Sequence, residues 1–198
     1  MSPRLTGPET QARIMDAAAA CFAEAGYDAS GVAEICRRAD VSKGAFYHHF
    51  ASKHDLFMLL LSRWLASLDA KLLAAQGSTS NVPDELTSMA GMAGGVFEAA
   101  RGQLPMFLEF WTKAARDPDV WQATIAPYHG YRTFFADRIR SGIAEGSLAP
   151  ADPDSAASAI VAMAVGMLLQ GLLDPSGGDW AQSTVSGIQM LLNGMRPR

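Results

Sequence analysis

Cysteine is scarce in this chain of 198 residues, which holds only Cys21 and Cys36. Two cysteines cannot build the disulfide framework on which many small secreted domains depend. Both fall on apolar positions of expected helices, where cysteine usually behaves as a small buried hydrophobe. We therefore expect two reduced, buried thiols in a cytoplasmic protein, with a disulfide or a redox sensor as the weaker alternative.

An excess of positive charge is also absent, because 16 Lys and Arg face 20 Asp and Glu, which gives a formal net charge of −4. Residues 1–54 hold six basic and six acidic side chains, and residues 55–198 hold ten and fourteen. Proteins that coat nucleic acid without regard to sequence are normally strongly basic. This class is excluded, so any DNA binding must depend on local geometry.

Uncharged apolar stretches that approach the length of a membrane span are absent with one exception, residues 155–173. This stretch contains Gln170, and acidic residues flank it where a span usually has basic or aromatic anchors. We interpret it as a helix buried between subunits, with a membrane span as the alternative, and expect no membrane partner. The first residues have no apolar core segment, so we expect no signal peptide.

Strand patterns and internal repeats are lacking as well. Apolar residues recur at steps of three and four, which predicts an all-α fold of about nine helices. The expected helices cover roughly residues 8–25, 32–39, 42–50, 53–75, 83–101, 104–116, 118–145, 154–173 and 179–193. The order predicts a three-helix N-terminal domain over residues 1–54 and a larger helical domain over residues 55–198.

The stretch from Ala39 to Lys53 combines a tight turn, a short helix and the capped start of a long helix. Asp40 tolerates the left-handed conformation of a tight turn, and Ser42 is a good N-cap. The residues expected to face inward are Val41, Phe46 and Phe50; those expected to face outward are Lys43, Gly44, Ala45, Tyr47 and His48. This is the pattern of a helix-turn-helix reader of DNA.

The run Val-Ser-Lys-Gly-Ala-Phe-Tyr-His-His-Phe over residues 41–50, followed by Ser52-Lys53, resembles the DNA-binding domain of the TetR-type repressors. The resemblance is close over residues 9–60 and weaker beyond. Three positions depart from the family pattern: Gly31 stands where a capping Thr or Ser is usual, Cys36 replaces a common Ala, and Asp40 replaces a common Gly. The first departure puts one phosphate contact in doubt.

A recognition helix of this length fits the major groove. We expect Ser42, Tyr47 and Lys53 to contact phosphates, and Lys43, Gly44, Ala45 and His48 to lie against base edges. For Tyr47 and His48 the alternative is an ordinary solvated helix face.

The resemblance implies that the second half encloses a pocket for an apolar or amphipathic inducer. The residues expected to contact the ligand are Phe97, Arg101, Phe107, Phe110, Trp111, Tyr128, Tyr131 and Gln170. The alternative is that most of these aromatic side chains fill a core.

The resemblance also implies that the last two helices form a dimer interface. The residues expected there are Ala159, Ala162, Gly166, Ile188, Leu191 and Leu192, because small side chains let helices approach and large apolar ones supply buried area.

Together these features predict a homodimeric, ligand-responsive repressor that binds a palindromic DNA operator, with no catalytic activity, cofactor or metal. A helical enzyme is the second hypothesis, although the four histidines form no metal-ligand motif and no nucleophile or phosphate-loop motif is present. A third is a protein that uses its helix-turn-helix for protein contacts.

Overall fold

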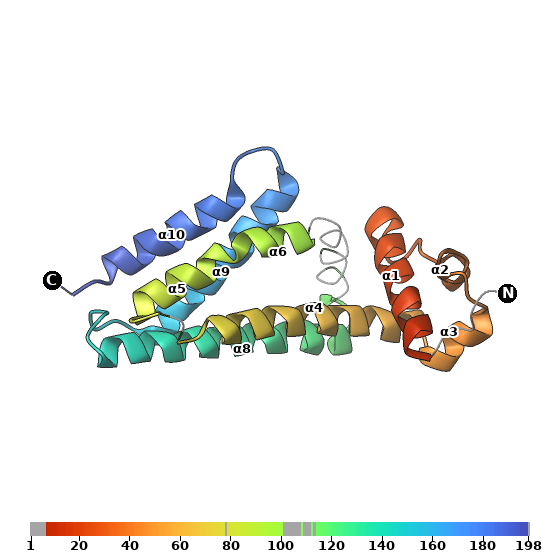
Figure 1. Ribbon diagram of the computed structural model, residues 1–198, viewed down its shortest axis with the longest axis horizontal. Helices are drawn as coiled ribbons and strands as arrows, with labels where there is room; N and C mark the ends of the chain where they lie inside the picture. Colours follow the sequence, from red (N-terminus) through yellow and green to blue (C-terminus); the bar gives the residue numbers. More distant parts are fainter. Residues whose placement is uncertain (1–6, 78, 101–107, 109–111, 113, 198) are drawn as a thin grey trace. The chain divides into compact units, whose positions relative to one another are not determined.

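The computed structural model describes residues 7–77, 79–100, 108, 112 and 114–197, which contain helices and no strand (Figure 1). The helices are α1 (Gly7–Ala25), α2 (Val32–Ala39), α3 (Lys43–His49), α4 (Lys53–Ala75), α5 (Val82–Gly91), α6 (Ala93–Ala100), α8 (Pro118–Ala144), α9 (Pro153–Leu173) and α10 (Trp180–Gly194). The all-α prediction is confirmed.

One predicted helix is divided in two. The segment expected to be helical over residues 83–101 is broken at Met92, between α5 and α6. The two glycines that follow, Gly94 and Gly95, have low helix propensity, which weakens a continuous helix at this point. The helix expected over residues 104–116 lies mostly outside the described residues.

The chain forms two compact units. The first comprises Met1–Ala66 with Gly102–Thr124, and the second comprises Ser67–Arg101 with Ile125–Arg198. The first unit therefore extends beyond the domain boundary expected at residue 54. The reason is that the beginning of α4 carries Leu56 into the same core as the helices before it.

The core of the first unit is aromatic and aliphatic. Its largest fully buried side chains are Ile14, Phe22, Ile35, Phe46, Leu56 and Phe57. Phe22 and Phe57 meet edge to face at 5.6 Å between ring centroids. Ala114 and Val120 complete this core from a distant part of the sequence.

The core of the second unit joins α5, α8, α9 and α10, and α10 lies against both α5 and α9 (Figure 1). Its buried side chains include Val82, Leu86, Ile139, Leu148, Ile160, Ile188 and Leu192.

A buried ion pair ties α5 to α8 within this unit. Arg138 Nε lies 2.8 Å from Glu85 Oε1, and the Glu85 side chain is 3% exposed. Glu85 Oε2 also accepts the backbone N–H of Gly77 at 2.9 Å. Glu145, near the end of α8, accepts the N–H of Val82 at 2.9 Å. These contacts fix the end of the α4–α5 connection.

Both cysteines are free and buried in the first unit, as predicted. Burial raises the pKa of the Cys36 thiol, because an apolar environment disfavours the thiolate.

Candidate nucleic-acid interface

A three-residue turn connects α2 to α3. Asp40 adopts the left-handed conformation with φ 51° and ψ 51°, and its N–H donates to Arg37 O at 3.2 Å. The N–H of Val41 donates to Cys36 O at 3.0 Å, and the Val41 side chain packs against the core. Ser42 then caps α3, since its Oγ accepts the N–H of Ala45 at 3.1 Å. The expected turn and cap are both present.

Helix α3 divides its residues between two faces. Phe46 is fully buried, and its ring centroid lies 5.6 Å from that of buried Phe50. On the other face Tyr47 is 56% exposed, and Lys43, Gly44 and His48 are exposed as well. The structure thus brings Ser42, Lys43, Gly44, Ala45, Tyr47 and His48 together on and around one short helix, with Ala45 half-buried.

Gly44 leaves the outer face of α3 open. A Cβ added there would have only Ser42 Oγ nearby, at 3.6 Å. A base edge or a sugar can therefore approach the backbone of α3 closely at this residue.

Lys53 has a different environment from the α3 residues. Its Nζ donates to Tyr27 O at 2.7 Å and to Ser30 O at 2.9 Å, and it lies 4.1 Å from the centroid of the Tyr27 ring. Its phosphate contact stays a prediction. The structure gives the ammonium group partners inside the protein that the sequence did not indicate.

The arginines of the first three helices are paired with carboxylates. Arg37 Nε lies 2.8 Å from Glu34 Oε2, Arg38 Nη2 lies 2.8 Å from Glu24 Oε2, and Arg13 Nη2 lies 3.4 Å from Asp40 Oδ2. The hydrogen bond from Arg37 lowers the pKa of the Glu34 carboxyl group. In contrast, the ammonium of Lys43 makes no hydrogen bond or ion pair with the described residues.

Gly31 occupies the N-cap position of α2 without a side chain to cap it. Its backbone is extended, with φ −84° and ψ 150°, and an added Cβ would meet nothing within 4 Å. A serine therefore fits this position sterically. The preceding residue, Ser30, is buried, and its hydroxyl donates to Cys21 O at 2.9 Å.

Two family models match this chain. One, described as bacterial regulatory proteins of the tetR family, matches residues 14–59, and the other, described as the C-terminal part of BetI-type transcriptional repressors, matches residues 96–185. The chain belongs to the TetR family of transcriptional regulators. The first match covers α2, the turn and α3. Its relatives are transcriptional regulators and not enzymes.

Two relatives of this TetR-family regulator match over a little more than a third of its length. It is 36% identical over 69 residues to the A-factor receptor protein of Streptomyces griseus, covering 35% of this chain and 25% of that protein. It is 36% identical over 78 residues to the transcriptional activator FasR of Mycolicibacterium smegmatis, covering 39% of this chain and 36% of FasR. These matches span about a quarter to a third of the relatives' lengths.

Similarity to solved structures extends over the whole fold. A transcriptional regulator from Saccharomonospora viridis, crystallised in complex with choline, superposes with a TM-score of 0.84 at 20% identity. The superposition covers 96% of this chain and 100% of that one. At this identity the likeness establishes the shared fold of the TetR-family regulator.

The residues predicted to contact a ligand are placed only in part. Arg101, Phe107, Phe110 and Trp111 lie outside the described residues, as does the side chain of Phe97. Gln170 is exposed, and its side-chain amide donates to Gly166 O of the same helix at 3.3 Å.

Tyr128 and Tyr131 are half-buried on α8. The hydroxyl oxygen of Tyr131 is buried near the Asp69 carboxylate, and it has no close hydrogen-bond partner within the part of the chain that the structure describes. Burial, followed by the nearby charge of Asp69, raises the pKa of Tyr131, and burial alone raises that of Tyr128. Both phenols are therefore neutral across the physiological pH range.

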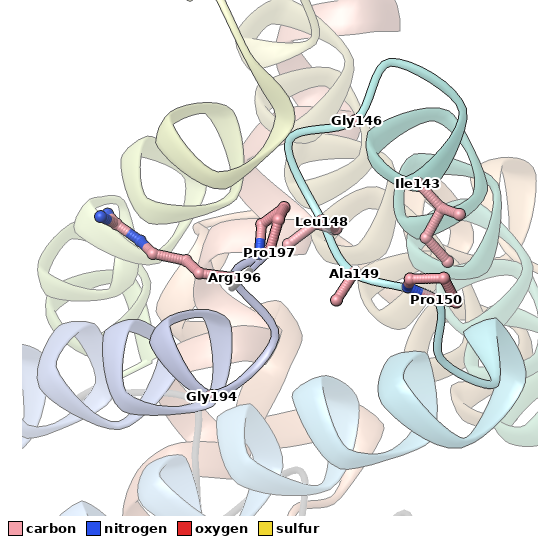
Figure 2. Close-up of a pocket in the computed structure, with 8 residues that line it drawn as sticks. All are labelled: Ile143, Gly146, Leu148, Ala149, Pro150, Gly194, Arg196 and Pro197. Carbon is pink, nitrogen blue, oxygen red and sulfur yellow. The ribbon is translucent and has the colours of Figure 1, made fainter.

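A hollow of about 560 Å³ lies elsewhere in the second unit (Figure 2). It is lined by Ile143, Gly146, Leu148, Ala149, Pro150, Gly194, Arg196 and Pro197. None of the predicted ligand contacts lines it.

The predicted dimer residues fall into two groups. Ala162 of α9 is exposed, while Ala159, Gly166 and, on α10, Leu191 are half-buried. In contrast, Ile188 and Leu192 are 3% and 2% exposed within a single chain, and their place in a dimer interface stays a prediction. The apolar face of α10 that carries them is covered by α5 and the rest of the core.

Helix α9 is apolar and poorly covered. Its segment Pro153–Gly171 has a mean hydropathy of 1.3 and is long enough to cross a membrane, yet only 22% of it is buried in the chain. It is the one such helix among the described residues. Gly166 on this helix faces open space, since an added Cβ would meet nothing within 4 Å.

Proposed function

We propose that this TetR-family protein is a homodimeric repressor that binds a palindromic operator and is released by a small apolar or amphipathic inducer. The observation that carries the proposal is the division of α3. Phe46 and Phe50 hold the helix in the core, and Lys43, Gly44, Tyr47 and His48 are left exposed.

The exposed face of α3 has the groups needed for reading DNA. Lys43 can donate to the acceptors of a guanine in the major groove, and the methyl group of Ala45 can contact a thymine methyl. Tyr47 presents a hydroxyl for a phosphate oxygen. The bases are therefore read by residues near the beginning of α3, and Tyr47 sets the depth of the helix in the groove.

We infer dimerisation from the charge of residues 1–54 and from the low burial of α9. Residues 1–54 carry no net charge, and Arg13, Arg37 and Arg38 are engaged in ion pairs, so one copy has little electrostatic attraction to DNA. Two copies joined through the uncovered face of α9 would add their contacts. A two-fold dimer reads two half-sites about one helical turn apart, or a multiple of it.

The inducer would bind near α8 in the second unit. The buried hydroxyl of Tyr131 has no close hydrogen-bond partner among the described residues, and a ligand acceptor could supply one. Aromatic faces also attract organic cations, so choline, which is bound in the Saccharomonospora viridis structure, is a sensible first probe beside a medium-chain fatty acid.

Helix α4 is the element through which such a ligand would act. Its first residues belong to the first unit and its last residues to the second. To convert a population from almost fully DNA-competent to almost fully incompetent, the inducer must prefer the second state by about 10⁴-fold, or about 5.5 kcal/mol.

A binding assay against the DNA flanking the protein's own gene tests this function. We expect a specific, salt-sensitive shift at dimer stoichiometry, abolished by an inducer identified through thermal stabilisation of the free protein. Absence of any shift at low salt with both flanks would favour the enzyme or protein-contact alternatives.

A further inference from the structure

The last two residues of α3 are histidines whose rings meet each other. His48 is exposed and His49 is half-buried, and their ring centroids lie 5.1 Å apart at an interplanar angle of 77°. Neither imidazole forms a hydrogen bond or an ion pair with a residue that the structure describes. A proton, or an acceptor on DNA, can therefore bind these ring nitrogens without displacing a partner in the described part of the protein.

The carboxylates of the turn before α3, of α2 and of the first turn of α4 are engaged with other groups. In the turn before α3, Asp40 pairs with Arg13 of α1. On α2, Glu34 pairs with Arg37. In the first turn of α4, Asp55 accepts a serine hydroxyl from three residues before it at 2.9 Å. These groups do not hold either imidazole in its charged form.

The acidic residues of α1 do not pair with the imidazoles either. Glu24 pairs with an arginine of α2. The first turn of α1 approaches His49, since a Cβ added at Gly7 would lie 3.8 Å from His49 Cε1, and this turn carries Glu9, which has another partner. Asp16 is exposed further along α1. A proton on either ring therefore adds positive charge that no described carboxylate cancels by direct contact.

The charge of α3 depends on the protonation of these two rings. With neutral imidazoles the helix carries one positive charge, on Lys43, and two imidazolium ions would raise this to three. Lys53, at the beginning of α4, is a further cation near this end of the helix. Histidine changes its charge between about pH 5 and 8, and a neighbouring phosphate favours the protonated form.

We propose that DNA binding by this protein takes up protons at His48 and His49, so that the operator is held more tightly as the pH falls from about 8 to about 6. The inference rests on the proposed DNA-binding function. Phosphates stabilise the imidazolium ions, so the complex binds more protons than the free protein does. The affinity that this adds is present at low pH and is lost as the pH rises through the range in which the bound imidazoles titrate.

The dependence of affinity on pH tests this linkage. The probe is a synthetic duplex that the wild-type protein selects from a randomised pool at about pH 6, and its affinity is measured at constant ionic strength at about pH 6, 7 and 8. Each imidazole whose titration moves up by one pH unit in the complex adds about 10-fold at low pH, and a dimer has four such rings. We expect the wild-type protein to bind at least about 10-fold more weakly at the highest pH than at the lowest.

Glutamine substitutions assign the protons to residues, because glutamine keeps a hydrogen-bond donor and an acceptor but does not titrate. The double variant His48→Gln with His49→Gln should lose the pH dependence. The control is His129→Gln, at an exposed position of α8 in the second unit, which should keep it. Unchanged pH dependence in the double variant would overturn the proposal and move the proton uptake to His54 or another group. So would pH-independent binding by the folded wild-type protein.

Two further measurements keep the test decisive if the double variant folds poorly. His48→Gln alone, at an exposed position, should reduce the pH dependence, and full wild-type dependence in this variant would contradict the proposal. The wild-type salt dependence should also be steeper at low pH, by about 0.9 for each imidazolium that neutralises a phosphate, and equal slopes would contradict it. Failure to select any duplex at any pH would refute the proposed function itself, which is a distinct outcome.

Discussion

The two compact units use their apolar residues in opposite ways. The first unit buries its large aromatic side chains around α3 and exposes a small polar face. The second unit buries one face of α10 and leaves the apolar helix α9 only 22% buried. The first arrangement suits a partner rich in phosphate and polar edges, and the second suits a second copy of the protein. Four experiments on substituted proteins sharpen or break this contrast.

Phe46→Ala should have the largest effect on the first unit. Phe46 is fully buried, and its removal should cost about 3–5 kcal/mol of stability and abolish DNA binding. Denaturant unfolding measures the loss of stability, and a DNA-binding assay measures the loss of binding. Retention of binding with an unchanged unfolding midpoint would show that α3 does not depend on this core.

Glu85→Ala should have a comparable effect on the second unit alone. It leaves Arg138 without its carboxylate, and breaking a buried pair costs about 3–5 kcal/mol. The matched control is the double variant Glu85→Leu with Arg138→Met, which should recover most of the loss. Equal destabilisation of single and double variants, measured by denaturant unfolding, would contradict this account.

Gly142→Ala and Gly130→Ala compare two glycines of α8. A Cβ at Gly142 would lie 2.7 Å from Leu148 Cδ1 and 3.1 Å from Val82 Cβ, so this variant should lose about 1–3 kcal/mol. At Gly130 an added Cβ meets nothing within 4 Å, and the variant should gain up to about 1 kcal/mol. Thermal unfolding measures the stability of each variant. An equal shift in the unfolding midpoint of the two variants would refute the close packing at Gly142.

Gly31→Ser should have the smallest effect on stability, and the effect should be stabilising. A serine can cap α2, which should add a few tenths of a kcal/mol, roughly, to stability. Its hydroxyl can also reach a phosphate, so DNA affinity should rise. Gly91→Ser, at the end of α5, is the control, because that position also has open space and lies far along the chain. Equal effects of the two substitutions on DNA affinity would exclude a cap-specific contact.

Much of the first unit could be predicted from local sequence. The cap at Ser42, the turn at Asp40 and the hydrogen bond between Ser52 and Asp55 depend on neighbours within three residues. The partners of Lys53 could not be predicted in this way, because folding brings Tyr27 and Ser30 to it from more than twenty residues away.

The second unit was harder to predict for a related reason. Periodicity indicates that α10 has an apolar face, but it does not indicate whether that face meets the same chain or another. Ile188 and Leu192 turned out to pack inside the chain. Similarly, the division between α5 and α6 at Met92 depends on how far tertiary packing compensates for the low helix propensity of the two glycines that follow.

Selection of DNA from a randomised pool by the wild-type protein and by Lys43→Met and Tyr47→Phe tests the central claim most directly. We expect the wild-type protein to select a palindrome with half-sites about one helical turn apart or a multiple of it. Lys43→Met should change the preferred base at one position of each half-site, and Tyr47→Phe should keep the sequence and bind more weakly. A selected sequence without two-fold symmetry, or one that Lys43→Met leaves unchanged, would contradict the assignment of α3 as the reading helix of a dimer.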